Sequence, residues 1–499
     1  MKNKKKLIKY SVSFFSVLLA IYLISSFFVK QKIEKKIEDL ALKNNVSITS
    51  TTKINLLLGN FSFLDVKIEK NSFSIQSKLL KIEDISYYNI LFNKQLSITN
   101  LKVVEPQILG KIADFKIDNT KVKDSSKTAL KNITINQLEV INGFVHISNA
   151  NNKDIKVKSF DLKIDKLTNR KENHKFPFSY GNIFFKADSV DQKVSLIQQL
   201  KINNISLKNN TLTISKLALQ PLKPKNNYIN YVKEEKDLYD INLDSLKIVN
   251  IDITKKEKYT IAADSINIYN GDFNIYADKT RFLNSKKIKN LYSKALRELN
   301  FLICINQLNI KDSKLTYEEL LKKENKPGLL VFEKLNVITN KIDNSTDNTN
   351  KQVIIIDTDF MGSSPLHVKY EFKIQDVSDN FRIRGTLKNV TSKNMSSYIS
   401  PALNVSMDGF INRMDFDFEG NNWSSNGKFD VMFKDFKVKI NKKKKKNKFL
   451  SWLANVIIKD TSKNGLITVD VKEVKRNQTK SFWNFFWKNI EEGLIKSVL

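Results

Sequence analysis

The sequence predicts a mainly β protein that starts with a transmembrane helix and continues as antiparallel strands with few helices. Two observations carry this prediction. Residues 10–29 form a run of twenty amino acids without a formal charge. From residue 46 onward, apolar residues mostly alternate with Lys, Asn, Ser or Asp, which is the period of strands with one dry and one wet face.

The uncharged run is long enough to cross a membrane. At ~1.5 Å of rise per residue it makes a helix of roughly 30 Å, the thickness of the hydrocarbon core of a bilayer. A cleaved signal peptide is the alternative, but the run exceeds the usual apolar core of ~7 to 15 residues and no Ala-x-Ala site follows it. We therefore expect a retained anchor formed by Tyr10, Phe14, Phe15, Leu18, Leu19, Ile21, Leu23, Ile24, Phe27, Phe28 and Val29.

The charges that flank the run predict a cytoplasmic amino terminus. Five Lys and no acidic residue lie within residues 1–9, which favours the cytoplasmic side. Four further Lys lie within residues 30–36 and are only partly offset by Glu34 and Glu38, so the two flanks compete. Because long domains cross membranes largely regardless of such charges, we expect a single-pass protein with most of its chain on the far side.

The basic composition does not by itself predict a nucleic-acid binder. The formal net charge is +32, but only seven of the 84 basic residues are Arg, the side chain best suited to reading bases and clamping phosphate. Two interpretations stay open, a background bias toward Lys and attraction to anionic lipid headgroups. Cys304 is the only cysteine, so one chain can form neither an intramolecular disulfide nor a thiolate metal cluster.

Periodicity divides the chain into segments. The basic residues 1–9 and the anchor 10–29 precede a membrane-proximal helix at 30–45. Residues 46–341 are predicted to be strands, with an amphipathic helix near 285–300 and a hairpin of 315–321 with 329–338. A polar linker, 342–352, leads to a second β region at 353–440, which ends in a hairpin that turns at 420–422.

One spacing recurs in the strands: apolar, two residues, apolar, one residue, apolar. Its intervals are irregular, unlike those of a solenoid or propeller with a fixed period of ~20 to 50 residues, and chance supplies some matches. The occurrences are Ile98/Leu101/Val103, Ile135/Leu138/Val140, Ile202/Ile205/Leu207, Leu243/Leu246/Ile248, Ile305/Leu308/Ile310 and Phe332/Leu335/Val337.

The C-terminal part combines a basic segment with an aromatic helix. Residues 441–480 form a basic loop and tail that open with the run KKKKKNK, either a solvated loop or a contact to anionic lipid. Residues 481–499 are predicted to form an amphipathic helix, which either lies in a membrane interface or groove or packs on the protein's own sheet. Its apolar face comprises Trp483, Phe486, Trp487, Ile490, Leu494 and Val498.

The sequence offers no constellation of catalytic, cofactor-binding or metal-binding residues. His146, His174 and His367 lie far apart in the chain, without the paired spacing of a metal site. No GxGxxG, GxxxxGK[ST] or GxSxG motif appears, so phosphate-binding loops and nucleophile elbows lack support. The prediction is a protein that is not an enzyme.

Several phrases resemble AsmA-like proteins of the bacterial envelope. They are the basic amino terminus with one span, LSITNLKVVEPQILG at 96–110, and GFINRMDFDFEGNNWSSNGKFDVMFKDFKVKI at 409–440. The ending, KFLSWLANVIIKDTSKNG at 448–465 followed by residues 481–499, resembles the branch common in Bacteroidetes-type bacteria.

The resemblance implies an inner-membrane anchor and an elongated periplasmic β-sheet curled into a groove with an apolar inner face, as in bridge-type lipid transfer proteins. Such a groove would shield acyl chains and support phospholipid transport between the inner and outer membranes. The implied partners are phospholipids, the inner membrane, and the outer membrane or an envelope protein, without nucleic acid. The alternative is a structural or regulatory envelope protein that affects outer-membrane protein assembly without carrying lipid. The candidate groove-lining residues are Ile98, Leu101, Val103, Ile133, Ile135, Val145, Ile147, Leu246 and Ile248.

Overall fold

The computed structural model describes residues 2–111, 132–148, 154–169, 178–255, 257–280, 287–403, 405–440 and 465–498. Strands make up 61% of the structure, so the mainly β prediction is confirmed. The 23 strands belong to one large sheet, which is mixed rather than purely antiparallel. The chain divides into unit 1, residues 1–193 and 203–209, and unit 2, residues 194–202 and 210–499.

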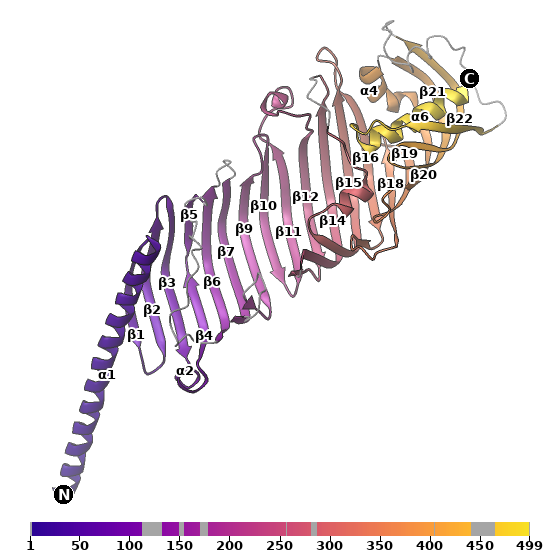
Figure 1. Ribbon diagram of the computed structural model, residues 1–499. Coiled ribbons are helices and arrows are strands. Elements are labelled where there is room, and N and C mark those ends of the chain that lie inside the picture. Colours follow the sequence, from indigo (N-terminus) through magenta and orange to yellow (C-terminus); the bar gives the residue numbers. More distant parts are fainter. Residues whose placement is uncertain are drawn as a thin grey trace. The chain divides into compact units, whose positions relative to one another are not determined.

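Unit 1 begins with one continuous helix, α1 (Lys2–Asn44), because neither Gly nor Pro interrupts this segment. Its part Ser16–Asn44 is long and apolar enough to be a single membrane span or a signal anchor. The described part of the span is unburied in the structure, with side chains such as Leu19 and Phe28 more than half exposed. After Asn44 the chain turns, and β1 runs back beside α1 (Figure 1).

The strands of unit 1 pair with near neighbours in sequence. β1, β2 and β3 are successively antiparallel, β3 also pairs antiparallel with β4 and β5, and both of these run parallel to β6. β6, β7 and β9 are again antiparallel, and the helix α2 (Tyr87–Asn93) joins β3 to β4. The bounds are β1 Ser47–Asn55, β2 Asn60–Lys70, β3 Phe73–Ile85, β4 Gln95–Val104, β5 Gln107–Lys111, β6 Asn132–Ser148, β7 Asp154–Asn169, β8 Phe178–Ser179 and β9 Ile183–Lys193.

Unit 2 continues the same architecture with longer strands, while β10 (Gln198–Lys208) has residues in both units. β14 and β15 are parallel, and the other pairs among the described strands β11–β23 are antiparallel. The bounds are β11 Thr211–Pro221, β12 Leu238–Val249, β13 Asp252–Lys255, β14 Tyr259–Asp278, β15 Leu302–Leu320, β16 Gly328–Thr339, β17 Ile342–Asp343, β18 Lys351–Phe360, β19 Ser364–Lys373, β20 Phe381–Thr391, β21 Val405–Gly420, β22 Ser424–Ile440 and β23 Ile467–Lys475.

A recurring backbone irregularity accompanies most occurrences of the spacing found in the sequence, within the strand for Phe332/Leu335 and on the paired strand for Ile98/Leu101, Ile135/Leu138 and Leu243/Leu246. We call it the left-handed step: a residue with φ near +50° that has an apolar residue two positions before it and another directly after it. Asp and Asn tolerate this conformation better than most residues. The step keeps both apolar residues on one face, since Leu387 and Val390 pack into one core across Asn389. The left-handed residues are Asp65, Asp84, Lys166, Ser189, Lys216, Asn250, Lys334, Asn389, Asp435 and Glu473.

Helices cover the apolar face of the last strands of unit 2. α6 (Phe482–Val498) packs on β22 and β23, and α4 (Ser392–Leu403) packs on β16, β20 and β21. The short helix α3 (Tyr292–Arg297) contributes to the same region, because Leu291, the residue before it, is 1% exposed within this core. The most deeply buried strand residues beneath the helices are Phe418, Phe429, Val431 and Val471.

Several predicted elements differ from the observed ones. The helix expected near 285–300 is confined to six residues, because the backbone at 287–291 is not helical and residues 281–286 lie outside the described residues. The expected linker 342–352 is an ordered connection that starts with β17, where Asn344 is buried and donates hydrogen bonds to the Leu296 and Phe301 carbonyls. The helices α2 and α4 and the strand β23 were not predicted. Most of the expected basic tail, residues 441–464, lies outside the described residues.

Candidate functional site

Three rows of apolar side chains cross unit 1, two of them from β1 to β9 and one from β2 to β9. Residues directly opposite on paired strands share a face, so the strand registers define each row. The left-handed step at Asp65 carries the same face from Phe63 to Val66. Row one is Ile54, Phe61, Ile82, Leu101, Leu138, Ile164 and Ile183; row two is Phe63, Leu80, Val103, Val140, Leu162 and Phe185; row three is Ile48, Ile68, Ile75, Ile108, Val145, Val157 and Val190.

Many of the side chains that alternate with these rows are charged and face the other side of the sheet. The register pairs Lys81 with Lys102, Lys102 with Glu139, and Glu139 with Lys163. Lys81 forms an ion pair with Glu83, which also accepts a hydrogen bond from Asn100 at 2.9 Å. Unit 1 therefore has one apolar face and one mixed face, which carries these charged side chains together with a row of Leu64, Leu79, Val104 and Ile141.

The apolar rows are only partly shielded from solvent. Of the twenty side chains, Phe61 alone is buried, and the others are half-buried. Within the described part of unit 1, the helices α1 and α2 pack mainly against β1 and β4. A contiguous apolar surface of this extent is unusual on a soluble protein.

Small residues shape the face between rows two and three. Gly143 lies opposite Phe160, and a Cβ atom on Gly143 would stand 2.3 Å from the Phe160 ring. The ring therefore lies across the glycine, and any larger residue at 143 would displace it. Opposite Phe160 on β9 lies Ala187, which is 1% exposed. The face thus has a flat strip between two rows of larger side chains.

The structure brings most of the predicted groove-lining residues onto this apolar face. Ile98 and Ile135 are directly paired and buried, and Ile133, 36% exposed, lies two residues from Ile135 on the same face. Val145 and Ile147 follow along β6. Leu101 and Val103 belong to rows one and two. Leu246 and Ile248 lie in unit 2, where they pair with Ile268 and Ile266 in a comparable half-buried row.

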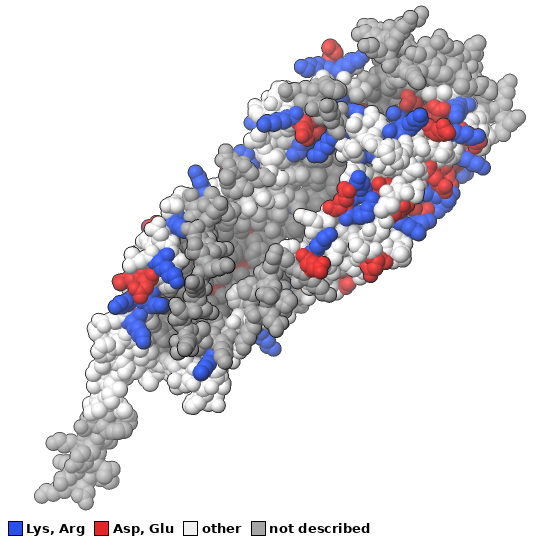
Figure 2. Space-filling view, viewed as in Figure 1, with Lys and Arg blue, Asp and Glu red and all other residues white. Residues whose placement is uncertain are grey.

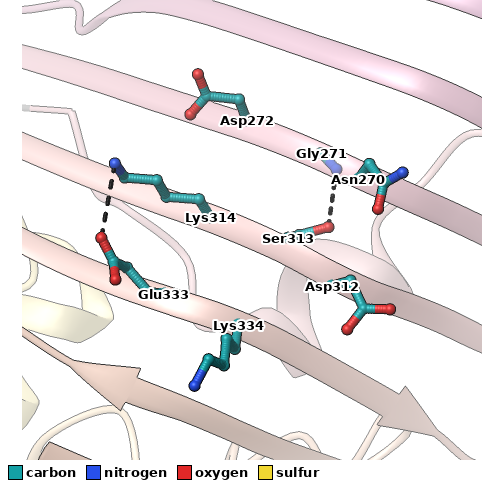
Figure 3. A pocket seen from close by; sticks show the side chains of 8 residues that line it. All are labelled: Asn270, Gly271, Asp272, Asp312, Ser313, Lys314, Glu333 and Lys334. Carbon is teal, nitrogen blue, oxygen red and sulfur yellow. Dashed lines mark hydrogen bonds and ion pairs between the residues drawn. The ribbon is translucent and has the colours of Figure 1, made fainter. Parts of the chain in front are cut away.

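A polar hollow of about 370 Å³ lies on β14, β15 and β16 of unit 2 (Figure 3). The backbone residues Asn270, Asp312 and Lys334, all with positive φ, line it on successive strands. The Gly271 N–H donates to the Ser313 hydroxyl at 2.9 Å, and the Lys314 ammonium lies 3.8 Å from the Glu333 carboxylate. These contacts tie neighbouring strands together across the irregularity and offer no nucleophile paired with a base.

The charged residues of unit 2 are interspersed. Basic and acidic side chains stand side by side over the C-terminal strands in Figure 2. Arg382 makes ion pairs with Asp417 at 2.6 Å and Glu419 at 3.1 Å, and Arg384 lies 3.1 Å from Glu371. The Arg382 guanidinium lowers the pKa of the Asp417 carboxyl. Positive charge on these strands is therefore largely neutralised locally.

Unit 2 also contains a polar cluster at one end of β15. Glu319 accepts hydrogen bonds from the Tyr317 and Tyr398 hydroxyls at 3.2 and 3.4 Å, and burial raises the pKa of its carboxyl. Lys279, 2.6 Å from Glu235 and 3.4 Å from Asp237, supplies positive charge nearby. Among the residues that the structure describes, no group of three or more His, Cys, Asp or Glu side chains is arranged to hold a metal ion.

The remaining predicted site residues lie in the two terminal helices. In α1, the side chains of Tyr10, Phe14 and Phe15 are outside the described set, whereas Leu18, Leu19, Ile21, Leu23, Ile24, Phe27 and Phe28 are exposed and Val29 is half-buried.

In α6, the structure shows the second of the two alternatives left open by the sequence, because the helix packs on the protein's own sheet. Ile490 is buried there, Phe486, Trp487 and Leu494 are partly buried, and only Trp483 remains 50% exposed. The side chain of Val498 is outside the described set. The sequence analysis missed Phe482 and Phe485, which are 4% and 1% exposed. Their spacing of about one helical turn was the pattern that could have predicted a second buried pair on this helix.

Fold and site together define a mainly β protein with one N-terminal apolar helix and a half-exposed apolar sheet face in unit 1. Comparison of the sequence with protein-family models and with curated proteins finds no match.

Proposed function

We propose that this protein is a membrane-anchored, AsmA-like envelope protein that shields lipid acyl chains on its apolar sheet face and so supports phospholipid transport between the inner and outer membranes. The observation that carries the proposal is the three apolar rows of unit 1, whose side chains are half-buried where a closed core would bury them fully. The proposal assigns the protein a carrier role and no enzymatic step.

The free energy of acyl-chain hydration explains what such a face would accomplish. Exposing one CH₂ group to water costs ~0.8 kcal/mol, so a sixteen-carbon chain costs on the order of 12 kcal/mol. Rows one and three each cross seven strands, and at ~4.8 Å between strands each extends roughly 29 Å. One leaflet of the hydrocarbon core is about 15 Å thick, so a row offers enough length to lie along an entire acyl chain.

The charged face suits the water-filled side of such a carrier. Lys81, Lys102 and Lys163 alternate with the apolar residues of their strands and keep the opposite face solvated. The apolar helix α1 would hold the protein in the inner membrane with its amino terminus in the cytoplasm and the sheet in the periplasm, as the five Lys in residues 1–9 favour.

Photocrosslinking in the full-length protein tests the proposal. Benzoylphenylalanine placed at Val145, on the apolar face, should form a covalent adduct with phospholipid upon irradiation of intact cells. The neighbouring residue His146 lies on the opposite face and is exposed, so the same probe there should give no lipid adduct. Mass spectrometry of the purified protein identifies the adducts.

Two results would overturn the carrier role. Absence of lipid at Val145 and at a second inward position, Leu138, would show that the rows do not contact acyl chains. An adduct of Val145 with another protein in stoichiometric amount, without lipid, would favour the structural or regulatory role in outer-membrane protein assembly instead.

A further inference from the structure

A second exposed apolar surface lies at one end of the strands in unit 1. Leu57 and Leu58, in the turn between β1 and β2, are 79% and 61% exposed. In α2, Tyr88, Leu91 and Phe92 are 66%, 73% and 72% exposed, and the rings of Tyr88 and Phe92 lie 5.0 Å apart. We call these five residues the turn patch.

Hydrogen bonds join the two parts of the turn patch to each other and to α1. The Tyr87 hydroxyl donates to the Leu56 carbonyl at 2.7 Å, which fixes α2 to the turn. The Leu58 N–H donates to the Asn55 side-chain oxygen at 3.3 Å, and the Tyr22 hydroxyl of α1 lies 3.5 Å from that same oxygen. The turn patch is therefore held beside Tyr22.

The position of Tyr22 sets the level of the turn patch along α1. Tyr22 lies within the uncharged run 10–29, seven residues before Val29, which corresponds to roughly 10 Å along the helix. The strand β1 returns the chain to this level: its nine residues extend about 30 Å, close to the ~33 Å of helix between Tyr22 and Asn44. Figure 1 shows the β1–β2 turn and α2 at the same end of the strands, beside the middle of α1.

We propose that the turn patch is inserted in the bilayer that α1 crosses, so that the end of the sheet is immersed in the acyl region of the leaflet nearest Val29. A depth of roughly 10 Å matches the ~5 to 10 Å to which interfacial apolar segments enter the acyl boundary. Lys53, four residues before Leu57, and Lys94, two residues after Phe92, have stems long enough to bring their ammonium groups to the headgroups.

Immersion would give the apolar rows direct contact with membrane lipid. Row one starts at Ile54 and Phe61, which flank the β1–β2 turn, so an acyl chain leaving the bilayer would meet row one without crossing water. The inference rests on α1 being the membrane span of the proposed function, and it adds the place where lipid would pass onto the sheet.

Spin-label accessibility in the full-length protein tests the immersion. Cys304 is replaced by Ala, and single cysteines at Leu57, Phe92 or Ser72 are spin-labelled after reconstitution in bilayers of phosphatidylethanolamine and phosphatidylglycerol. Ser72 is an exposed residue in the β2–β3 turn, at the other end of β2 and roughly 35 Å from Leu57. Leu57 and Phe92 should be accessible to oxygen and shielded from a water-soluble nickel chelate, with the opposite result at Ser72.

Each alternative gives a distinct result. If the labels at Leu57 and Phe92 are as accessible to nickel as the label at Ser72, the turn patch is in water and the inference is wrong. If neither reagent reaches them, a protein covers the turn patch and the inference is also wrong. Lipid adducts at Val145 would still be expected in both cases if the carrier role is correct, so the two proposals fail separately.

Discussion

The strands β19–β23 of unit 2 and the strands β1–β9 of unit 1 carry the same kind of apolar face, but helices close only the first. Beneath α6, Phe418 and Phe429 have no exposed surface and Val431 has 1%. In unit 1, the corresponding rows of Ile, Leu, Val and Phe remain half-buried. The difference between the two regions therefore arises from what covers the sheet.

The covering helices of unit 2 fit closely to the residues below them. A Cβ atom on Gly493 of α6 would stand 2.4 Å from the Phe429 ring, so the helix approaches the sheet at a position only glycine allows. Phe482 packs against Tyr370 at 4.8 Å and Phe381 at 5.3 Å between ring centroids. Such packing leaves no room for a ligand and gives this region a purely structural core.

Truncation of one core residue in each region should give the largest contrast. Phe429→Ala, beneath α6, is expected to lower the free energy of unfolding by about 3 to 5 kcal/mol, whereas Phe63→Ala in row two should cost about 1 kcal/mol. All four Trp lie between residues 423 and 487, so Trp fluorescence during urea unfolding reports on the covered region. Hydrogen exchange of β2 reports on Phe63→Ala. Equal losses at the two sites would show that the rows of unit 1 are closed as tightly as the core.

Removal of a buried ion pair tests how α3 is held. The Asp379 carboxylate, 3% exposed, accepts hydrogen bonds from Arg297 at 2.9 Å and from Ser293 at 2.8 Å. Asp379→Ala should destabilise the covered region by about 3 kcal/mol, because it leaves a partly buried guanidinium without its carboxylate. Asp417→Ala, at a surface ion pair with Arg382, is the control and should cost about 0 to 1 kcal/mol in the same urea titration. If Asp417→Ala lowered the free energy of unfolding as much as Asp379→Ala, the Arg297–Asp379 pair would not contribute more than a surface ion pair.

Alternation in the sequence was enough to place the residues of the open face. Ile98, Leu101, Val103 and Val145 fall on one side of unit 1 because strand periodicity is a local property. The three-residue spacing was visible too, but its cause was not, since the left-handed residue lies on either of two paired strands. For Ile135 and Leu138 it is Lys166 on the neighbouring strand.

Elements set by long-range contacts could not be predicted in the same way. The parallel pairing of β4 with β6 depends on a connection through residues outside the described set, and no local pattern marks it. The helix α4 contains Pro401 near its end and several Ser residues, a composition that does not favour a helix without the sheet beneath it. The aromatic helix was located correctly, but amphipathicity alone cannot distinguish a membrane from the protein's own sheet as its partner.

Polar substitution in row one should separate stability from lipid binding. Leu138→Gln places an amide on a half-exposed position, so the free energy of unfolding should change by about 1 kcal/mol or less. The loss of an apolar contact with an acyl chain should lower lipid affinity by about tenfold, or ~1.4 kcal/mol. The measurement is the amount of phospholipid per protein after gentle purification, with Glu139→Gln on the opposite face as the control. Unchanged lipid content in Leu138→Gln would argue against binding at this row.

The smallest expected effect concerns pH and the polar cluster beside α4. Because burial raises the pKa of Glu319 in the folded protein, the unfolded chain loses this proton at lower pH than the folded chain does. The contribution of Glu319 to stability is therefore full below about pH 4.5 and declines as pH rises toward its raised pKa. Glu319→Gln cannot ionise, so its unfolding free energy should fall less than that of the unmodified protein across this window. Urea titrations at a series of pH values measure how the unfolding free energy of each protein changes with pH. If it changes equally in both, Glu319 ionises as readily in the folded protein as in the unfolded chain. The polar cluster would then not distinguish the covered region from the open one.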